Sequence, residues 1–300
     1  MGGSTWSSDS YDKLKSSYST KTTSQIFTSS ALSNDMSPKG VKFRESRDSD
    51  AHPETLAIAV FLDETGSMGE IPSYLIREKL DKLIETLIKH GIPHPQVLFG
   101  GIGDHHSDSA PLQVGQFESG TVELNKWLTT LYLEGNGGGQ NKESYLLAYL
   151  FAARHTSTDT FEKRGVRNLL FTIGDEGCWE SLDAETLKNL MGYTEDVNVT
   201  VEELLNEVHR TYHVFHIHVN NHDQNVIKQW RNLLGERLII LDDYTATAEV
   251  IASTVALVHG VDLQSITSTF DAKTKLLVDK ALANVSKSDI IKSDKGVINL

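Results

Sequence analysis

The chain has 300 residues, of which 39% are apolar and 23% charged, and its formal net charge is −13 at pH 7. This length suffices for one large domain with its own core, and the negative charge argues against a general nucleic-acid binder and against contact with an anionic membrane. Cys178 is the single cysteine, so an intramolecular disulfide is excluded and a reducing compartment is favoured. We see no apolar run near the roughly 18 residues of a membrane span and no secretory signal at the start. We therefore expect a cytoplasmic protein.

Residues 1–51 are expected to form a polar N-terminal extension, because Ser, Thr, Asp and Lys predominate there and such a segment cannot fold alone. The stretch KFRESRDS, residues 42–49, carries both signs of charge. It is either a solvated linker or a segment docked onto the domain. We expect the domain itself over residues 52–262, followed by a tail over residues 263–300 with at most one helix, near 273–285.

Buried strands and amphipathic helices alternate after the extension. Seven consecutive apolar residues, 56–62, predict a strand over 55–62 that is buried on both faces of a parallel sheet. Pro72 then opens a helix with an apolar stripe at helical spacing, ended by Gly91 and Pro93. Further strands are predicted at 97–102, 168–173, 213–219 and 238–241, and helices at 122–131, 144–155, 226–234 and 246–259, with a capping box of Thr200 and Glu203 opening one more.

Residues 112–117 follow the second strand too closely for a helical crossover, so we expect them to pair antiparallel at the sheet edge. The whole alternation predicts an α/β fold. It is a three-layer α/β/α sandwich around a mostly parallel central sheet with one antiparallel edge strand.

Oxygen-bearing side chains follow the first predicted strand at alternate positions. Asp63, Thr65 and Ser67 stand there, and Gly66 and Gly69 permit a tight turn. The carboxyl ends of strands in open α/β sheets face the binding crevice. A carboxylate and two hydroxyls are suitable ligands for Mg²⁺.

Two more acidic residues stand at the ends of strands that should run parallel to the first. Asp104 follows the strand at 97–102, and Asp175 follows the strand at 168–173. Both should therefore open onto the same sheet edge as Asp63. The alternative roles are a helix N-cap for Asp63, a turn residue for Asp175, and either support of the site or no role for Asp104.

The D-x-T-x-S turn after a buried strand resembles the metal-ion-dependent adhesion site (MIDAS) of von Willebrand factor A (VWA) domains, as found in uncharacterised bacterial and phage proteins. The resemblance covers about residues 52–262. It implies a protein-binding module rather than an enzyme, in which Mg²⁺ or Mn²⁺ captures an acidic group of a partner protein. The implied metal residues are Asp63, Thr65, Ser67 and Asp175, and an AAA+ ATPase or another complex component is an implied partner.

One loop departs from the family pattern, which has Gly-Gly-Thr before the next helix. Here the loop reads GGGQNKES over residues 137–144 and contains no Thr. Gln140 and Asn141 are the nearest substitutes by position, and Ser144 also offers a hydroxyl; amide oxygens can bind hard cations. A domain with this fold and no working metal site, used as a scaffold, stays open as an alternative.

A Mg²⁺-dependent phosphohydrolase of the haloacid-dehalogenase kind is the second alternative, because such enzymes also begin with a buried strand ending in Asp. Their nucleophile is followed two residues later by an Asp that acts as acid and base. Thr65 stands at that position here and cannot donate a proton near neutral pH, which disfavours this reading.

Other residues with chemical potential are expected to be structural. His216 and His218 share a strand face and could form a zinc pair, but half-buried structural histidines are the favoured interpretation. Cys178 is expected to be a packing residue, and Trp127 and Trp230 are expected in the core.

Overall fold

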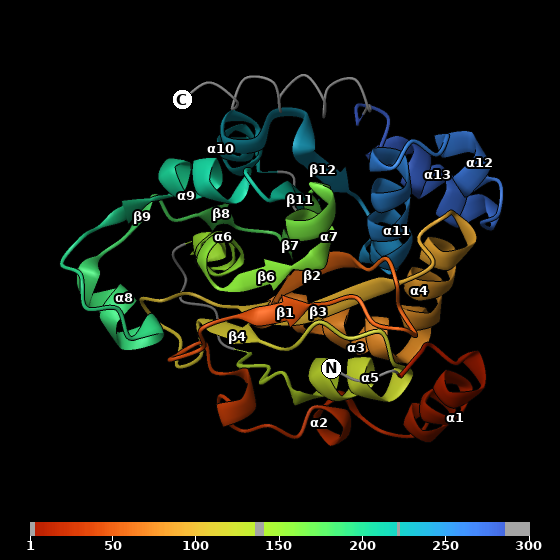
Figure 1. The fold of residues 1–300 in the computed structure, drawn as a ribbon, viewed down its shortest axis with the longest axis horizontal. Coiled ribbons are helices and arrows are strands. Elements are labelled where there is room, and N and C mark those ends of the chain that lie inside the picture. The colour runs from red at the N-terminus through yellow and green to blue at the C-terminus, as the bar shows by residue number, and fades with distance from the viewer. Residues whose placement is uncertain (1–3, 136–140, 221–222, 286–300) are drawn as a thin grey trace.

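The computed structural model describes residues 4–135, 141–220 and 223–285 of the chain. A six-stranded sheet lies at its centre, and Figure 1 shows helices on both of its faces. All neighbouring strands are parallel except the last pair, β3 with β4. In spatial order the strands are β12 (Leu238–Leu241), β11 (Tyr212–Val219), β7 (Asn168–Gly174), β2 (Leu56–Asp63), β3 (Pro95–Ile102) and β4 (Leu112–Val114). The predicted fold class, with its antiparallel edge strand, is confirmed.

The central strands are buried along almost their whole length because both faces of the sheet are covered. Every residue of Leu56–Asp63 is buried, and so is every residue of Pro95–Ile102. Side chains that alternate along β2 belong to two separate cores: Ile58 and Val60 pack into one, and Ala59 and Phe61 into the other. The first core includes α4 (Leu80–Lys89), α5 (Thr121–Thr130), α11 (Thr247–Val258) and α13 (Ala272–Ala281), and the second α6 (Tyr145–Arg154), α9 (Val201–Val208) and α10 (Gln224–Leu234).

The helical region after β2 begins earlier than predicted. A 3₁₀ turn, Gly66–Gly69, leads directly into α3 (Glu70–Tyr74), a π-helical turn over Leu75–Lys79, and then α4. Pro72 therefore lies inside the first turn of α3 instead of opening the helix. A proline is tolerated there because the N–H groups of a first turn have no partner within the helix.

Several short elements had no strong pattern in the sequence. The pairs β5 (Lys142–Glu143) with β8 (Gly177–Cys178) and β9 (Ser181–Leu182) with β10 (Val199–Thr200) are only two residues long. The helix α8 (Ala184–Met191) lies between β9 and β10. The tail contains α12 (Leu263–Thr267) before α13, so its described part has one helix more than we expected. The capping box of Thr200 and Glu203 is present as predicted.

The N-terminal segment lies against the domain rather than in solvent. It contains α1 (Ser8–Tyr18), α2 (Thr23–Ile26) and the strand β1 (Arg44–Ser46), which pairs with β6 (Thr156–Thr158). The Tyr11 side chain is fully buried, and its hydroxyl donates to the Ile76 carbonyl at 3.1 Å. Aromatic anchors spaced along a polar segment are thus enough to dock it onto a core that already exists.

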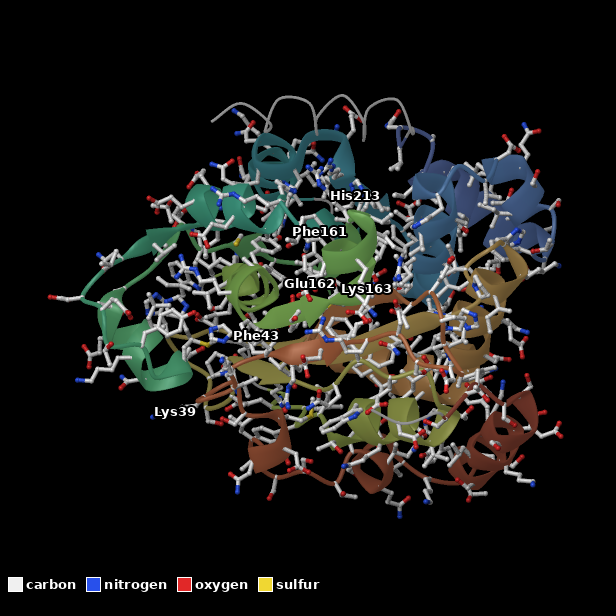
Figure 2. The ribbon with its side chains drawn as sticks, in the orientation of Figure 1. Lys39, Phe43, Phe161, Glu162, Lys163 and His213 are labelled. Atoms are coloured by element: carbon white, nitrogen blue, oxygen red, sulfur yellow. The ribbon has the colours of Figure 1, made fainter. Side chains whose placement is uncertain are left out.

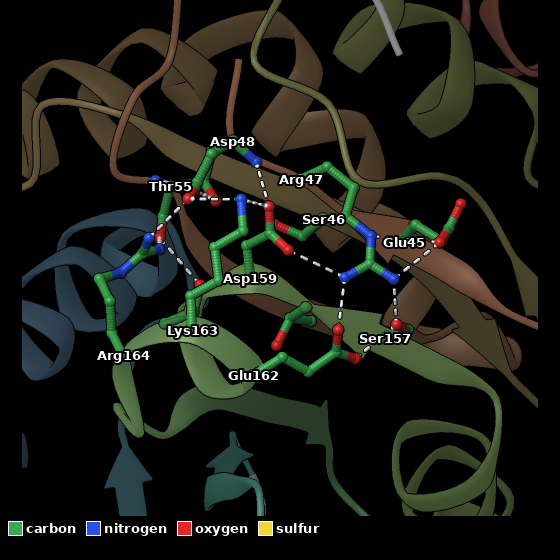
Figure 3. Close-up of polar contacts among 12 residues, drawn as sticks. Glu45, Ser46, Arg47, Asp48, Thr55, Ser157, Asp159, Glu162, Lys163 and Arg164 are labelled. Atoms are coloured by element: carbon green, nitrogen blue, oxygen red, sulfur yellow. Dashed lines mark hydrogen bonds and ion pairs between the residues drawn. The ribbon is translucent and has the colours of Figure 1, made fainter.

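A network of charges fastens the end of this segment to α7 (Asp159–Arg164), as Figure 3 shows. The Arg47 guanidinium donates to Asp159 at 2.9 Å and to Glu162 at 2.6 Å. The Asp48 carboxylate accepts from Arg164 at 2.7 Å. Of the two alternatives for residues 42–49, the docked segment is therefore the one observed.

Farther back, the same segment reaches the region of α8. Gly40 donates its N–H to the Met191 carbonyl at 3.5 Å, and Figure 2 shows Lys39 and Phe43 along this stretch. Phe43 is one of the few large apolar side chains exposed in the described residues. Within the same residues, no helix combines the length and apolar character needed to cross a membrane.

Candidate metal site

The turn after β2 is held by the side chain that the sequence analysis placed at its centre. Asp63 Oδ1 accepts from the Thr65 backbone N–H at 2.9 Å and from the Thr65 hydroxyl at 2.6 Å. Gly66 follows at a φ of 36°, in the left-handed region that favours glycine. Asp63 and Thr65 are both buried. The carboxylate and the hydroxyl are thus fixed beside each other at the carboxyl end of the central strand.

A second carboxylate, Glu143, meets this pair from a distant part of the chain. Its side chain is only 3% exposed, and Oε1 accepts from the Thr65 hydroxyl at 3.3 Å. The other oxygen, Oε2, is buried and has no hydrogen-bond partner among the described residues. Leaving a buried carboxylate oxygen unpaired is costly. The Thr65 hydroxyl therefore lies between two carboxylates, one of which keeps a buried oxygen without a hydrogen bond.

The end of β7 approaches Asp63 on its other side. A methyl carbon added at Gly174 would lie 2.7 Å from Asp63 Oδ2 and 1.9 Å from the Tyr145 hydroxyl. That hydroxyl donates to Asp63 Oδ2 at 2.9 Å. Asp175 comes directly after this close approach, and its charge contributes to the raised pKa of Asp63. Asp63 and Asp175 thus lie in one electrostatic neighbourhood, as the parallel strand ends predicted.

Burial is the first cause of the raised pKa of Asp63; the hydrogen bonds from Thr65 and Tyr145 oppose it, and the Asp175 charge adds to it. The pKa of Glu143 is also raised, by burial first and then by the charge of Asp63. Each carboxylate makes the ionised form of its neighbours less favourable. The cluster therefore needs either protons or a cation to offset its charge.

The other predicted metal residues have different surroundings. Asp104 is buried, but its oxygens accept from Trp179 Nε1 at 2.8 Å, the His106 backbone N–H and the Ser107 hydroxyl. Its charge still contributes to the raised pKa of Glu143, which suits a supporting role more than direct contact. Ser144 is also taken by another partner, because its hydroxyl bonds His105 Nδ1 at 2.6 Å.

Of the remaining candidates, one is exposed, and the side chains of the other two lie outside the described residues. Asn141 is exposed, and its backbone carbonyl accepts from the Gly177 N–H at 3.1 Å. Gln140 lies outside the described residues, and so does the side chain of Ser67, although its backbone belongs to the 3₁₀ turn. Their proposed contact with a metal stays a prediction.

The residues present fit a divalent cation. Within the described ranges, no three side chains among His, Cys, Asp and Glu meet closely enough to hold a metal by themselves. A cation here would lie at the Thr65 hydroxyl, which the Asp63 and Glu143 carboxylates both contact. Hard cations prefer this oxygen donor set. The unpartnered Glu143 oxygen provides an anionic donor that no protein group has claimed.

Sequence reasoning missed two residues of this cluster. Glu143 is in the Gly-rich loop, close to Gln140 and Asn141, the positional substitutes for a family Thr. The signal available was its place next to the first apolar turn of α6, although nothing in the sequence shows that it points inward. Tyr145 carries no signal in the sequence, and its bond to Asp63 follows only from the close approach at Gly174.

The histidines and the cysteine are deeply packed. His216 and His218 are fully buried, so the expectation of half-buried side chains is wrong in degree. His216 stacks on Trp230 with ring centroids 3.7 Å apart, and its Nδ1 bonds the Thr172 hydroxyl at 3.0 Å. β11 is an interior strand covered on both faces, which accounts for the greater burial. Cys178, Trp127 and Trp230 are buried, as predicted.

No protein-family model and no curated protein matches the chain. Similar solved structures include the pilus adhesin SpaC from Lactobacillus rhamnosus GG, in an open conformation, with 8% identity over 70% of this chain and 31% of that one at a TM-score of 0.46. Proximal thread matrix protein 1 from the mussel byssus, with a zinc-occupied MIDAS motif, is 9% identical over 69% of this chain and 47% of its own, at a TM-score of 0.41. A von Willebrand factor type A structure from Catenulispora acidiphila is 13% identical over 75% and 51%, at 0.40.

The chain therefore spans between 31% and 51% of the length of these structures. At such identities and scores the likeness carries no argument about function.

Proposed function

We propose that this protein is a metal-dependent binding module. A divalent cation, Mg²⁺ or Mn²⁺, would be held by Asp63, Thr65, Ser67 and Asp175 and would bind an acidic group of another protein. The observation that carries the proposal is the meeting of the Asp63 and Glu143 carboxylates on the Thr65 hydroxyl, with one buried oxygen left unpartnered. When bound, the cation supplies the positive charge that an acidic side chain requires.

The protein's own groups supply position and surroundings. The Thr65 N–H and the Tyr145 hydroxyl fix the two oxygens of Asp63, which reduces the rearrangement needed on binding. The buried setting strengthens every charge interaction compared with water. No nucleophile or proton donor is needed for this role, so we propose a binding rather than a catalytic protein. An AAA+ ATPase as the partner and a cytoplasmic location belong to the same proposal.

The first test is direct metal binding. Isothermal titration of the full chain with Mn²⁺ and Mg²⁺ is expected to give one site, which Asp63→Asn removes while the circular dichroism spectrum stays unchanged. A matched control is Asp12→Asn, which removes an exposed carboxylate on α1, far from β2 in the fold (Figure 1). Equal metal affinity in wild type and Asp63→Asn would refute the proposed site.

The second test is partner capture. Wild type, Asp63→Asn and Asp12→Asn are each immobilised, and the retention of partner proteins is compared in the presence of Mg²⁺ and of EDTA. The proposal expects wild type and Asp12→Asn to retain partner proteins with Mg²⁺. It expects no retention by Asp63→Asn, and none by any of the three in EDTA. Retention that chelation leaves unchanged would refute metal dependence and would favour the metal-free scaffold. Hydrolysis of a generic phosphate ester that requires Mg²⁺ and Asp63 would instead favour the phosphohydrolase.

A further inference from the structure

The loop that delivers Glu143 is held on both sides by backbone contacts. Lys142–Glu143 pair with Gly177–Cys178 in a short parallel ladder, and the Glu143 carbonyl accepts from the Trp179 N–H at 3.3 Å. On the other side, the Ser144 N–H donates to the Gly103 carbonyl at 3.1 Å. The loops that follow β3 and β7 thus fix the backbone of Glu143. Its position beside Thr65 is a property of the fold rather than of a free loop.

The Glu143 side chain is itself anchored at one oxygen only. Oε1 receives the Thr65 hydroxyl, whereas Oε2 is buried and unpartnered among the described residues. Lys142, the adjacent cation in sequence, does not supply the missing charge, since its ammonium bonds Glu180 at 2.6 Å on the outside of the loop. A buried, unpartnered carboxyl oxygen next to a second carboxyl group and a hydroxyl is placed to serve as a ligand for a cation.

We propose that Glu143 is a carboxylate ligand supplied by the chain itself, and that it occupies the position which the binding module would otherwise offer to a partner's acidic group. The inference rests on the proposed function, because it concerns the same cation. It also makes that function conditional. A partner's carboxylate must displace Glu143 before it can reach the metal.

The charges support this assignment. Asp63, Glu143 and the nearby Asp175 carry three negative charges when ionised, which already exceed the two positive charges of Mg²⁺ or Mn²⁺. A fourth carboxylate would therefore be repelled while Glu143 stays in place, and attracted once it leaves. The site is accordingly expected to bind its cation without any partner, and to bind acidic groups weakly as long as the Glu143 carboxylate stays on the cation.

Chemical rescue distinguishes a ligand from a structural carboxylate. Mn²⁺ affinity is measured by titration calorimetry for wild type, Glu143→Ala and Glu180→Ala, each with and without acetate. We expect Glu143→Ala to bind Mn²⁺ at least about tenfold more weakly than wild type. Acetate should restore part of this affinity, because it refills the vacated position, and it should change neither wild type nor Glu180→Ala. Glu180 is the matched control, since it lies close by and bonds Lys142 instead of Thr65.

Three outcomes would overturn the inference. If Glu143→Ala binds Mn²⁺ with wild-type affinity, Glu143 is not a metal ligand. The proposed function survives that result if Asp63→Asn still abolishes Mn²⁺ binding. A loss of affinity that acetate leaves unchanged makes Glu143 a positioning residue acting through Thr65. Absence of Mn²⁺ binding in wild type refutes the proposed function and this inference together. If Glu143→Ala does not fold, Glu143→Leu removes both oxygens at a similar side-chain volume, and wild-type affinity in that variant is equally decisive against the assignment.

Discussion

Gly174 is where a single methyl group should disturb both the core and the candidate site. It is the last residue of β7, and an added Cβ would lie 1.9 Å from the Tyr145 hydroxyl oxygen and 2.7 Å from Asp63 Oδ2. Both distances are far shorter than normal contacts. Tyr145 is fully buried and Asp63 nearly so, and neither can swing into solvent. The change Gly174→Ala must therefore displace the tyrosine hydroxyl from the carboxylate.

The cost can be assembled from its parts. Overpacking of a close-packed site costs about 1–3 kcal/mol, and loss of a hydrogen bond to a charged group costs about 1.5–3 kcal/mol. Reduced freedom of the unfolded chain returns about 0.4–1 kcal/mol. We expect a net loss of about 2–5 kcal/mol in the free energy of unfolding. With an unfolding entropy of roughly 2.1 cal/mol/K per residue, this lowers the midpoint by about 3–8 °C for a chain of this size.

Urea unfolding followed by circular dichroism measures this loss, and Gly69→Ala is the matched control. No atom lies within 4 Å of a Cβ added at Gly69, and its φ is −58°, which any residue adopts. The control is expected to be as stable as wild type or slightly more so. If Gly174→Ala is no less stable than Gly69→Ala, the close approach of β7 to Asp63 is wrong, and β7 does not border the candidate site.

Three further outcomes are expected. Mn²⁺ at about a hundredfold above its dissociation constant should stabilise wild type by about 2.7 kcal/mol, seen as a higher thermal midpoint that Asp63→Asn loses; equal shifts in both would count against the site. Tyr11→Phe removes the buried bond to the Ile76 carbonyl and should cost about 1–3 kcal/mol in urea unfolding, whereas Tyr18→Phe, whose bond to Asn125 is partly exposed, should cost less; equal costs would contradict the docking geometry. Burial would raise the pKa of Asp48, but its bonds to Arg164 and Thr55 outweigh that and lower it. The stability it contributes is then fully present above its unfolded pKa of about 3.9 and is lost as the pH falls toward the folded value. The protection factors of the Arg44–Ser46 amides in hydrogen exchange should fall below about pH 4, and protection factors that persist unchanged to pH 2 would refute this.

The fold could be predicted from the sequence because its strands lie between two covered faces. The continuous apolar run 56–62 and the mostly apolar stretch 168–173 are typical of strands buried on both faces of a parallel sheet. The edge strand at 112–114 was predictable from the short connection alone. The two-residue pairs β5 with β8 and β9 with β10 were not, since they depend on loops brought together by the finished sheet.

Only part of the candidate site could be predicted from the sequence. Asp63 and Thr65 are neighbours in the chain, and the strand-end rule places Asp175 beside them. Glu143 is different, because its inward direction is set by the backbone bonds of Ser144 to Gly103 and of Glu143 to Trp179, whose partners lie far away in the sequence. The N-terminal segment shows the same limit. Its polar composition indicates that it cannot fold alone, but it does not predict that Tyr11 is buried against the folded domain.

The docked N-terminal segment has a practical consequence for anyone who shortens this protein. A fragment cut at residue 52 would lose the buried rings of Tyr11 and Tyr18 and the thioether of Met36 from the first core. It would also leave Asp159 and Glu162 on α7 without the guanidinium that they share. Expression trials that trim the chain to residues 52 onward would thus remove side chains that complete the first core. The shortest fragment worth purifying starts ahead of Trp6.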